Sequence, residues 1–462
     1  MHRLFAFLLL LASVSAARAE TAPAPLADLA VDEVWSGHPV TFAFVTERGH
    51  QFVAYYDAGR RITVAGRSLD QAGWTRHQPA GIPLPARKRD SNVTAWDSHN
   101  YLALALDRDG FLHLSGNLHD DPLIYYRSER PFDVTSLRRL DRMTGLREKK
   151  TTYPVFFKNA AGDLLFRYRD GGSGNGSDIY NRYDTATRTW QNILSSPLLD
   201  GQGERNAYAL PPLLGPDGRF HLVWMWRDTP DAATNHTLSY ARSADFLHWE
   251  KCDGTPIPLP ITFASAEVID PVPARQGLIN MTFNLGFDST NRPVVTYHRY
   301  DEAGKSQIYA ARPAADASRW HVTALSDWDF RWQFGGGGSL IAEVLLGPAA
   351  LQPDRSLLVD YVTTRSAGSG RWRLDPDTLR TVEKLPPPAA ALPPALRLPL
   401  AGFPGAEVQT VLSRDSGRLW ILRWETLPHN RDLPRASAPP PSSLRVIEVP
   451  DADTSRAARI GS

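Results

Sequence analysis

Two histidines, His99 and His119, are the residues whose type and surroundings most directly suggest chemistry. They lie twenty positions apart, and each belongs to a short polar cluster, one over residues 97–100 and the other over residues 116–120. Histidine changes its charge near neutral pH, so a pair of imidazoles can both accept and donate a proton. If the fold brings the two clusters together, the chain has a proton-transfer pair.

Three further residues carry side chains suited to the same chemistry, Tyr153, Arg169 and Arg227. A phenol can transfer a proton, and a guanidinium can pair with a carboxylate through two parallel hydrogen bonds. Each residue also has a purely structural explanation. Tyr153 can be a core residue, whereas Arg169 and Arg227 are each followed by an aspartate, Asp170 or Asp228, with which an ion pair can form.

The segment that must position the two histidines is typical of a β-hairpin. Leucines alternate with alanines over residues 102–106, and apolar residues resume over residues 111–114. Residues 107–110 read D-R-D-G, which predicts a turn between two strands with a period of two. Because a hairpin brings the far ends of its strands together, we expect His99 and His119 to lie at one edge of a small sheet.

A turn containing glycine, asparagine or serine, followed by an alternating apolar strand, recurs seven times along the chain. The turns fall at positions 49, 110, 162, 218, 291, 355 and 417. Repeated short strands with little helical periodicity are typical of radially arranged sheets. We therefore predict an all-β fold, a single seven-bladed β-propeller of four-stranded antiparallel blades over residues 20–450. A large β-sandwich or two separate β-domains is the alternative for such irregular repeats.

The two ends of the chain lie outside this predicted domain. A short basic start, an apolar run over residues 4–14 and the sequence A-R-A at residues 17–19 predict a secretory signal peptide over residues 1–19. No later apolar run approaches the ~20 residues of a membrane-spanning helix. We expect a secreted or periplasmic protein without a membrane span, and a flexible C-terminal tail over residues 451–462.

Composition narrows the class of partners. The chain has 51 lysines and arginines against 50 aspartates and glutamates, so no basic surface is expected to recruit nucleic acid. The single cysteine, Cys252, excludes an internal disulfide framework. Thirteen tryptophans and fifteen tyrosines provide for a large core. We expect a monomer that binds neither nucleic acid nor membrane.

These motifs together resemble the BNR-repeat family of the BNR_4 type, which includes ulvan lyases, rhamnosyl-glucuronate lyases and α-L-rhamnosidase-like enzymes. The resemblance extends from Gly37 to Gly338 and fades in the last two predicted blades. It rests on the spacing of the two histidines, the sixteen-residue spacing of Tyr153 and Arg169, and the motifs D-S-H-N (97–100), D-R-D-G-F-L-H-L-S-G-N-L-H (107–119), P-L-I-Y-Y-R-S (122–128) and W-M-W-R-D-T-P (224–230).

The resemblance implies an exported polysaccharide lyase that cleaves a rhamnose–glucuronate linkage in an anionic polysaccharide or oligosaccharide. Four residues are implied to be catalytic: His99, His119, Tyr153 and Arg169. Six more are implied to bind the substrate: Asn100, Asn117, Tyr208, Arg227, His236 and His298.

The chemistry of a lyase explains these residue types independently. Cleavage by β-elimination removes the proton at C5 of the uronate, next to the carboxylate, and expels the oxygen at C4. An arginine must pair with the carboxylate and stabilise the charge that develops. A histidine or tyrosine accepts the C5 proton, and a nearby acid protonates the departing oxygen. No redox cofactor is required.

Metal binding is a separate expectation. Cys252, His236 and His248 can be combined into a zinc site such as some relatives hold, but their spacing matches no strong zinc signature. We therefore expect Cys252 to be a buried free thiol and leave a structural calcium or zinc ion open. The run Gly335–Gly338 lacks the lysine of a phosphate loop and predicts an open loop or a close backbone approach.

Two other functions remain open. A glycoside hydrolase of the α-L-rhamnosidase-like kind on the same scaffold would need two carboxylates facing the scissile bond. Asp97, Asp120, Asp121 and Asp170 are available for that role. A non-catalytic propeller would bind glycans without turning them over, since a fold alone does not define a function.

Overall fold

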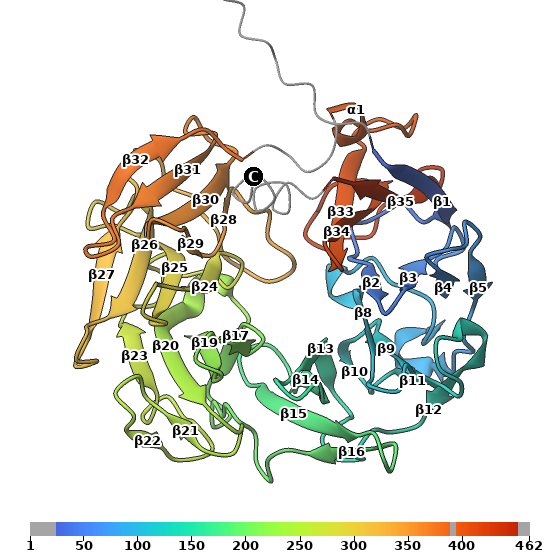
Figure 1. Ribbon diagram of the computed structural model, residues 1–462, viewed down its shortest axis with the longest axis horizontal. Helices are drawn as coiled ribbons and strands as arrows, with labels where there is room; N and C mark the ends of the chain where they lie inside the picture. The colour runs from blue at the N-terminus through green and yellow to red at the C-terminus, as the bar shows by residue number, and fades with distance from the viewer. Residues whose placement is uncertain (1–24, 389–393, 451–462) are drawn as a thin grey trace, which may run out of the picture.

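The computed structural model describes residues 25–388 and 394–450 and consists almost entirely of β-strands. Seven sheets contain four or more strands each, and a two-stranded sheet accompanies them. Figure 1 shows the large sheets arranged around a common centre rather than stacked in two layers. The described residues form a single α-helix, α1 (Pro394–Arg397). The prediction of an all-β fold built from antiparallel sheets is confirmed.

The first three large sheets and the small sheet come from residues 43–192. The first sheet contains β2 (Ala43–Glu47), β3 (His50–Tyr56), β4 (Ile62–Ser68) and β5 (Thr75–His77). The small sheet pairs β6 (Pro83–Leu84) with β7 (Arg89–Asp90). The second large sheet contains β8 (Leu102–Leu106), β9 (Leu112–Gly116), β11 (Tyr125–Ser128) and β12 (Leu137–Leu140). The third contains β10 (His119–Asp121), β13 (Thr151–Lys158), β14 (Leu164–Asp170), β15 (Ser177–Asp184) and β16 (Thr189–Asn192).

The fourth, fifth and sixth large sheets follow in chain order. The fourth contains β17 (Asn206–Ala209), β18 (Leu213–Leu214), β19 (Phe220–Arg227), β20 (Asn235–Ser243), β21 (Trp249–Glu250), β22 (Pro256–Ile257) and β23 (Glu267–Asp270). The fifth contains β24 (Phe283–Phe287), β25 (Pro293–Tyr300), β26 (Ser306–Pro313) and β27 (Trp320–Ala324). The sixth contains β28 (Val344–Leu346), β29 (Ala350–Leu351), β30 (Leu357–Thr363), β31 (Ser369–Leu374) and β32 (Thr381–Leu385).

The seventh large sheet joins the two ends of the described chain. It contains β1 (Ala27–Val34), β33 (Glu407–Asp415), β34 (Arg418–Thr426) and β35 (Ser442–Val449). β1 pairs antiparallel with β35, so that Ala27 lies opposite Glu448. Figure 1 shows the resulting contact between the N-terminal strand and the C-terminal strands. This pairing fixes the first and last sheets of the chain next to each other.

The repeat found in the sequence corresponds to one strand of each large sheet. The seven predicted turns lead, in order, into β3, β9, β14, β19, β25, β30 and β34. Three sheets differ from the four strands expected, because additional short strands such as β10, β18 and β29 pair with them. The periodicity of two therefore located the sheets correctly but not the number of strands in each.

The predicted hairpin is confirmed as β8 and β9. Leu102 lies opposite Gly116 and Leu106 opposite Leu112, and the alternate residues Leu102, Leu104 and Leu106 are buried. Burial of each leucine contributes about 1.5–3 kcal/mol relative to exposure. The apolar alternation thus anchors the hairpin in the core. The polar segment before β8 and the polar segment after β9 begin next to each other, at the end of the hairpin opposite the turn.

His119 lies on the neighbouring sheet rather than on the edge of the hairpin sheet, which differs from the prediction. After β9 the backbone is left-handed at Asn117, with φ of 59°, and the chain passes into β10, where His119 is opposite Thr152 of β13. Gly116 permits this path because a Cβ there would lie 2.4 Å from the carbonyl oxygen of Tyr101. The two imidazoles therefore meet where two sheets adjoin.

Aromatic side chains fill much of the interior, as the composition predicted. The largest fully buried side chains include six tryptophans: Trp224, Trp226, Trp249, Trp332, Trp372 and Trp424. Such rings bury ~150–250 Å² each and dominate the energetics of a core. They give the chain its stability without disulfides, since Cys252 is a buried free thiol.

The predicted signal peptide over residues 1–19 and the predicted tail over residues 451–462 lie outside the described residues. Within the described part of the chain, no helix has the length and apolar character required to cross a membrane.

Candidate active site

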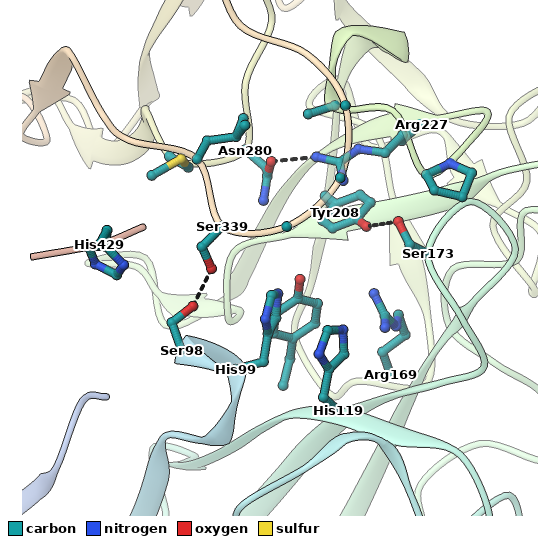
Figure 2. Close-up of a pocket in the computed structure, with 18 of the residues that line it drawn as sticks. Ser98, His99, His119, Arg169, Ser173, Tyr208, Arg227, Asn280, Ser339 and His429 are labelled. Carbon is teal, nitrogen blue, oxygen red and sulfur yellow. Dashed lines mark hydrogen bonds between the residues drawn. The ribbon is translucent and has the colours of Figure 1, made fainter. Parts of the chain in front are cut away.

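A cavity of about 360 Å³ collects most of the residues that the sequence singled out. Figure 2 shows its lining groups, which come from several sheets and from the loops between them. One side, here called the hairpin wall, contains His99, His119, Tyr153, Arg169, Tyr208 and Arg227. The other side, here called the strap wall, contains Asn280, Met281, residues 336–340 and His429.

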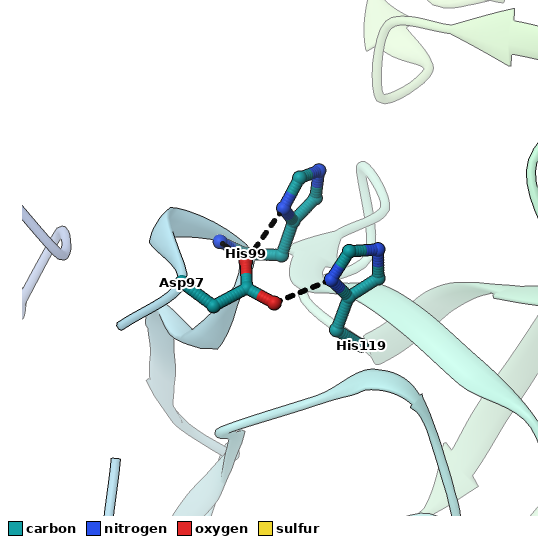
Figure 3. A group of neighbouring side chains, drawn as sticks. All are labelled: Asp97, His99 and His119. Carbon is teal, nitrogen blue, oxygen red and sulfur yellow. Dashed lines mark hydrogen bonds and ion pairs between the residues drawn. The ribbon is translucent and has the colours of Figure 1, made fainter. Parts of the chain in front are cut away.

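The two imidazoles are held by one carboxylate, Asp97. Nδ1 of His99 lies 2.8 Å from one carboxylate oxygen of Asp97, and Nδ1 of His119 lies 2.5 Å from the other. The rings are nearly parallel, with centroids 4.0 Å apart. Figure 3 shows the carboxylate of Asp97 joined to both rings, one oxygen to each. Because a carboxylate only accepts hydrogen bonds, both Nδ1 atoms carry protons, and Nε2 of each ring is left free of the carboxylate.

Asp97 stays ionised across the ordinary pH range. Burial opposes its ionisation, but the hydrogen bonds donated by His119 and His99 outweigh burial and hold the pKa of Asp97 well below its usual range. A backbone hydrogen bond from His99 N to Asp97 Oδ1, at 2.9 Å, adds to this effect and caps the short helix η2 (Ser98–Asn100). Asp97 together with the two imidazoles that it binds is called the clamp below. It fixes the tautomer and the orientation of both rings.

Asp97, His99 and His119 are also a group of residue types that can bind a metal ion. The nitrogen–oxygen distances of 2.5 and 2.8 Å favour hydrogen bonds instead. Two atoms bound to one zinc ion at ~2.0–2.2 Å with tetrahedral angles lie more than ~3 Å apart. Among the described residues, Cys252, His236 and His248 form no such metal-binding group.

Tyr153 reaches the cavity because β13 contains a bulge. Its backbone is left-handed, with φ of 60°, and the pairing of β13 with β14 shifts between Thr152 and Val155. Bulges of this kind redirect a side chain and occur often beside active sites. The ring centroid of Tyr153 lies 5.5 Å from that of His99. Burial, followed by the neighbouring Tyr208, raises the pKa of Tyr153, so this phenol keeps its proton at neutral pH.

Arg169 is a buried guanidinium that no carboxylate neutralises. The residue is only 2% exposed. Its guanidinium donates to the carbonyl oxygen of Gly171 at 3.0 Å and to Oγ1 of Thr152 at 3.1 Å. Within the described residues no carboxylate oxygen lies within 4.0 Å of it, and Asp170 instead pairs with Arg147 at 3.6 Å. The alternative explanation of Arg169 as the partner of Asp170 is therefore wrong.

Gly176 makes the position of Arg169 possible. A Cβ on Gly176 would lie 2.7 Å from Cδ of Arg169, closer than carbon atoms approach. The guanidinium carbon lies 4.9 Å from the ring centroid of Tyr153. Neighbouring strands of one sheet, β13 and β14, thus place a phenol and a cation on the same side of the cavity.

Arg227 and Tyr208 form a second pair on the hairpin wall. Arg227 donates to Oδ1 of Asn235 and to Oδ1 of Asn280, each at 2.7 Å, rather than pairing with Asp228. Its guanidinium carbon lies 3.9 Å from the ring centroid of Tyr208. Burial opposes ionisation of Tyr208, but Arg227 and then Arg169 outweigh burial and lower its pKa.

Four residues expected to contact substrate do not line the cavity, which corrects that expectation. Asn100 and Asn117 are both buried and bind backbone groups. Oδ1 of Asn100 accepts from the N–H of Ala95 at 3.2 Å, and the amide of Asn117 donates to the carbonyl oxygens of Ser91 and Val93, at 2.7 and 3.0 Å. His236 bonds to a carboxylate oxygen of Asp228 at 3.0 Å. His298 is fully buried in β25, and burial lowers its pKa to about 4.

The strap wall was not identified from the sequence. Asp432 organises it by accepting hydrogen bonds from the backbone N–H of Ser98 at 3.0 Å and of Ser339 at 2.9 Å. Asp432 Oδ1 also lies 3.0 Å from Nε2 of His38. No short-range pattern marks these residues, because they are hundreds of positions apart in the chain. The glycine run at 335–338 was the one available signal, and it does approach other backbone segments closely.

The lining of the cavity has no carboxylate among the described residues. None of the four aspartates considered for hydrolysis lines the cavity. Asp97 is clamped between imidazoles, and Asp121 pairs with Arg87 at 2.6 Å. Neither Asp120 nor Asp170 contributes to the lining. The arrangement can bind an acidic sugar and move protons, but it offers no facing pair of carboxylates.

Comparisons with known proteins identify the family of the chain and relatives of its fold. The sequence model of the BNR repeat-containing family matches residues 50–328, which is more than half of the chain. The fold is similar to that of the polysaccharide lyase Uly1, with a TM-score of 0.58, 15% identity, and coverage of 89% of this chain and 90% of that chain. It is also similar to a PL25 ulvan lyase bound to -[GlcA(1-4)Rha3S]-, with a TM-score of 0.60, 12% identity, and coverage of 93% and 98%.

Curated relatives match over a shorter stretch. The long isoform of ulvan lyase from Pseudoalteromonas sp. (strain PLSV) is 49% identical over 41 residues, which are 9% of this chain and 4% of that protein. The corresponding protein of Alteromonas sp. (strain LOR) is 46% identical over 41 residues, with the same coverage. The matched stretch thus spans only a small part of the length of these relatives.

Proposed function

The chain belongs to the BNR repeat-containing family, and we propose that it is a polysaccharide lyase. Its substrate is an anionic polysaccharide or oligosaccharide, cleaved at a rhamnose–glucuronate linkage by β-elimination. The seven large sheets support one seven-bladed propeller as the scaffold. The protein acts as a monomer after export to the periplasm or the medium.

One observation carries the proposal. Arg169 is a buried cation without a carboxylate partner among the described residues, and it faces the same cavity as the imidazoles held by Asp97. Burying a guanidinium without an anion is unfavourable, so the site is complete when a carboxylate binds there. A uronate supplies that carboxylate next to the C–H bond that must be broken.

The geometry supports a division of roles. Arg169 pairs with the uronate carboxylate and stabilises the charge that develops as the C5 proton leaves. Nε2 of a neutral imidazole, His99 or His119, accepts that proton. The C4–O bond breaks, a C4=C5 double bond forms, and Tyr153 donates its proton to the departing oxygen. The raised pKa of Tyr153 suits the acid, because the phenol arrives protonated.

The direct experiment is to incubate the purified protein with ulvan and with other glucuronate-bearing glycans. The proposal predicts an unsaturated uronate product that absorbs in the near ultraviolet. Release of shorter sugars without that absorbance would mean hydrolysis. Binding without any product on all such glycans would favour a non-catalytic glycan-binding protein.

The proposed mechanism requires no metal or redox cofactor. Activity is therefore expected to persist after dialysis against a chelator, with a zinc- or calcium-supplemented sample as the comparison. A structural ion elsewhere in the fold would show itself as a lower melting temperature after chelation without a change in the kcat of the folded enzyme.

A further inference from the structure

A second cavity, of about 490 Å³, lies directly behind the strap wall. We propose that it binds an anionic group, a carboxylate or a sulfate ester, on a sugar unit beyond the one that occupies the active site. The inference rests on the proposed function, since it extends the same polyanionic substrate past the catalytic cavity. The cavity is called the arginine groove below.

Three guanidiniums define the arginine groove, those of Arg275, Arg331 and Arg431. They come from three separate connections of the chain, after β23, between β27 and β28, and between β34 and β35. The convergence of unrelated segments distinguishes this groove from a run of charges along one exposed strand.

The positive charge of the groove is largely uncompensated. Asp231 is the one carboxylate among its described lining residues, and it lies 3.6 Å from a nitrogen of Arg275. Arg331 donates to the carbonyl oxygen of Gly304 and to the amide oxygen of Gln333, at 2.7 and 3.0 Å. Arg431 donates to carbonyl oxygens of the glycine run. These neutral acceptors position the guanidiniums without cancelling their charge.

The groove also has an apolar side suited to a sugar ring. Tyr300 and Phe334 lie beneath the cations, with ring centroids 6.2 Å apart. The guanidinium carbon of Arg331 is 3.7 Å from the ring centroid of Tyr300, which holds that side chain in place. Phe334 is partly exposed, and its apolar ring beside the cations matches a sugar that has an apolar face and an acidic substituent.

A single backbone segment separates the groove from the active site. Within the segment 230–233, Pro230 and Ala232 line the active site, whereas Asp231 and Ala233 line the groove. The glycine run at 335–338, called the strap here, contacts this segment. The N–H of Gly336 donates to Asp231 at 2.5 Å, and the carbonyl oxygen of Gly336 accepts from the N–H of Ala232 at 3.0 Å. Figure 2 shows the strap passing Ser339 and Asn280 on the active-site side. A chain of sugars that crosses the strap would pass directly from one cavity to the other.

The test measures binding in a full-length His119→Ala background, so that the ligand is not consumed. The probe is an oligosaccharide of the repeat -[GlcA(1-4)Rha3S]-. The double variant Arg275→Gln/Arg331→Gln is compared with a matched control, Arg130→Gln/Arg355→Gln, which removes two exposed arginines that lie outside both cavities.

The dissociation constant is expected to rise about tenfold in the groove variant and to stay within about twofold of the parent in the control. The difference should shrink as salt is added, because exposed charges are screened within about 10 Å at 0.1 M salt. Equal dissociation constants in parent, groove variant and control would overturn the proposal.

Desulfated and carboxyl-reduced forms of the probe separate the two sources of negative charge. The group whose removal weakens binding to the parent but not to the groove variant is the group that the groove holds. If the groove variant responds to both removals as strongly as the parent does, the groove holds neither group and the proposal fails.

The outcome is distinguishable from a failure of the proposed function. Absence of an unsaturated product with the unsubstituted protein would refute elimination and leave the binding result standing. Normal elimination together with unchanged dissociation constants would refute only the role of the groove.

Discussion

The two walls of the cavity are built in different ways. The hairpin wall takes His119, Tyr153 and Arg169 from three strands of one sheet, and Arg169 is held there by hydrogen bonds to the carbonyl oxygen of Gly171 and to Thr152. The strap wall consists of loops that are joined across the molecule through Asp432 and the glycine run. Rigid strands suit groups that must meet a reacting atom within a fraction of an ångström, and loops suit groups that select the ligand.

This difference leads to an expectation about function. Changes in the hairpin wall should lower kcat, because its groups act on the transition state. Changes in the strap wall should raise KM with little effect on kcat, because its groups contact substrate and transition state alike.

The largest effect is expected for Arg169. Arg169→Gln removes the cation that pairs with the uronate carboxylate, and kcat/KM should fall by about 10³ or more. Arg169→Lys should recover only part of the loss, since lysine keeps the charge but not the two parallel donors. Steady-state kinetics on the near-ultraviolet product give the measurement, and Arg182→Gln, on the neighbouring strand β15, is the control. An Arg169→Gln enzyme with near-normal kcat/KM would contradict the claim that the hairpin wall stabilises the transition state.

The next largest effect is expected for Asp97. In Asp97→Asn the two imidazoles lose the carboxylate that fixes their tautomer, so kcat should fall about 10²-fold or more while KM changes little. Asp107 offers a matched control, because it is a buried carboxylate 3.5 Å from Nε2 of His113 and outside the cavity. Asp107→Asn should lower stability but leave the kcat of the folded enzyme intact. Equal kcat losses in both variants would show that the clamp is merely structural.

The same clamp predicts a dependence of stability on pH. The folded-state pKa of Asp97 is depressed, so its contribution to stability is fully present above the unfolded pKa, about 3.9, and is lost as the pH falls towards the folded value. The difference in melting temperature between the natural protein and Asp97→Asn should therefore be constant above about pH 5 and should shrink below about pH 4. A difference that vanishes between pH 5 and 7 would contradict the assignment.

A smaller effect is expected on the strap wall. Asp432→Asn weakens the hydrogen bonds to Ser98 and Ser339, so KM should rise about tenfold while kcat changes by less than about threefold. Asp415→Asn, at the end of β33 and outside the cavity, serves as the control. A loss in kcat that matched the loss in Asp97→Asn would show that the two walls do not divide the work.

The smallest effect is expected for Tyr208, on the hairpin wall. Tyr208→Phe should reduce kcat/KM about threefold to tenfold, because a neutral hydrogen bond contributes ~0.5–1.5 kcal/mol. Its lowered pKa means that an ultraviolet titration should detect one tyrosine that ionises below the ordinary value of about 10. That early ionisation should vanish in Tyr208→Phe and move to higher pH in Arg227→Gln, which removes the main cation beside the ring. A titration unchanged in both variants would contradict this environment.

The sequence predicted the hairpin wall far better than the strap wall, for physical reasons. The alternation of leucines and alanines over residues 102–106 is a local consequence of burying one face of a strand, so it can be read without a structure. The resemblance implied that His99, His119, Tyr153 and Arg169 act together, and the structure places all four around one cavity.

The details that orient these residues could not be predicted. The bulge at Tyr153 and the left-handed turn at Asn117 depend on pairing with strands distant in the sequence. His298 was misplaced because a histidine in an apolar strand gives the same pattern whether it is buried or faces a cavity. Asp432 contacts Ser98 and Ser339, which are distant from it in the sequence, and no local pattern reveals such a contact.

The mass of the products is the most direct test of the central claim, that Arg169 and the clamped imidazoles carry out an elimination. A purified oligosaccharide containing a single rhamnose–glucuronate linkage is cleaved to completion, and both fragments are weighed by mass spectrometry. We predict that the two fragment masses sum to the mass of the intact oligosaccharide, because elimination adds no water. Fragments that together exceed it by one water molecule would contradict the account.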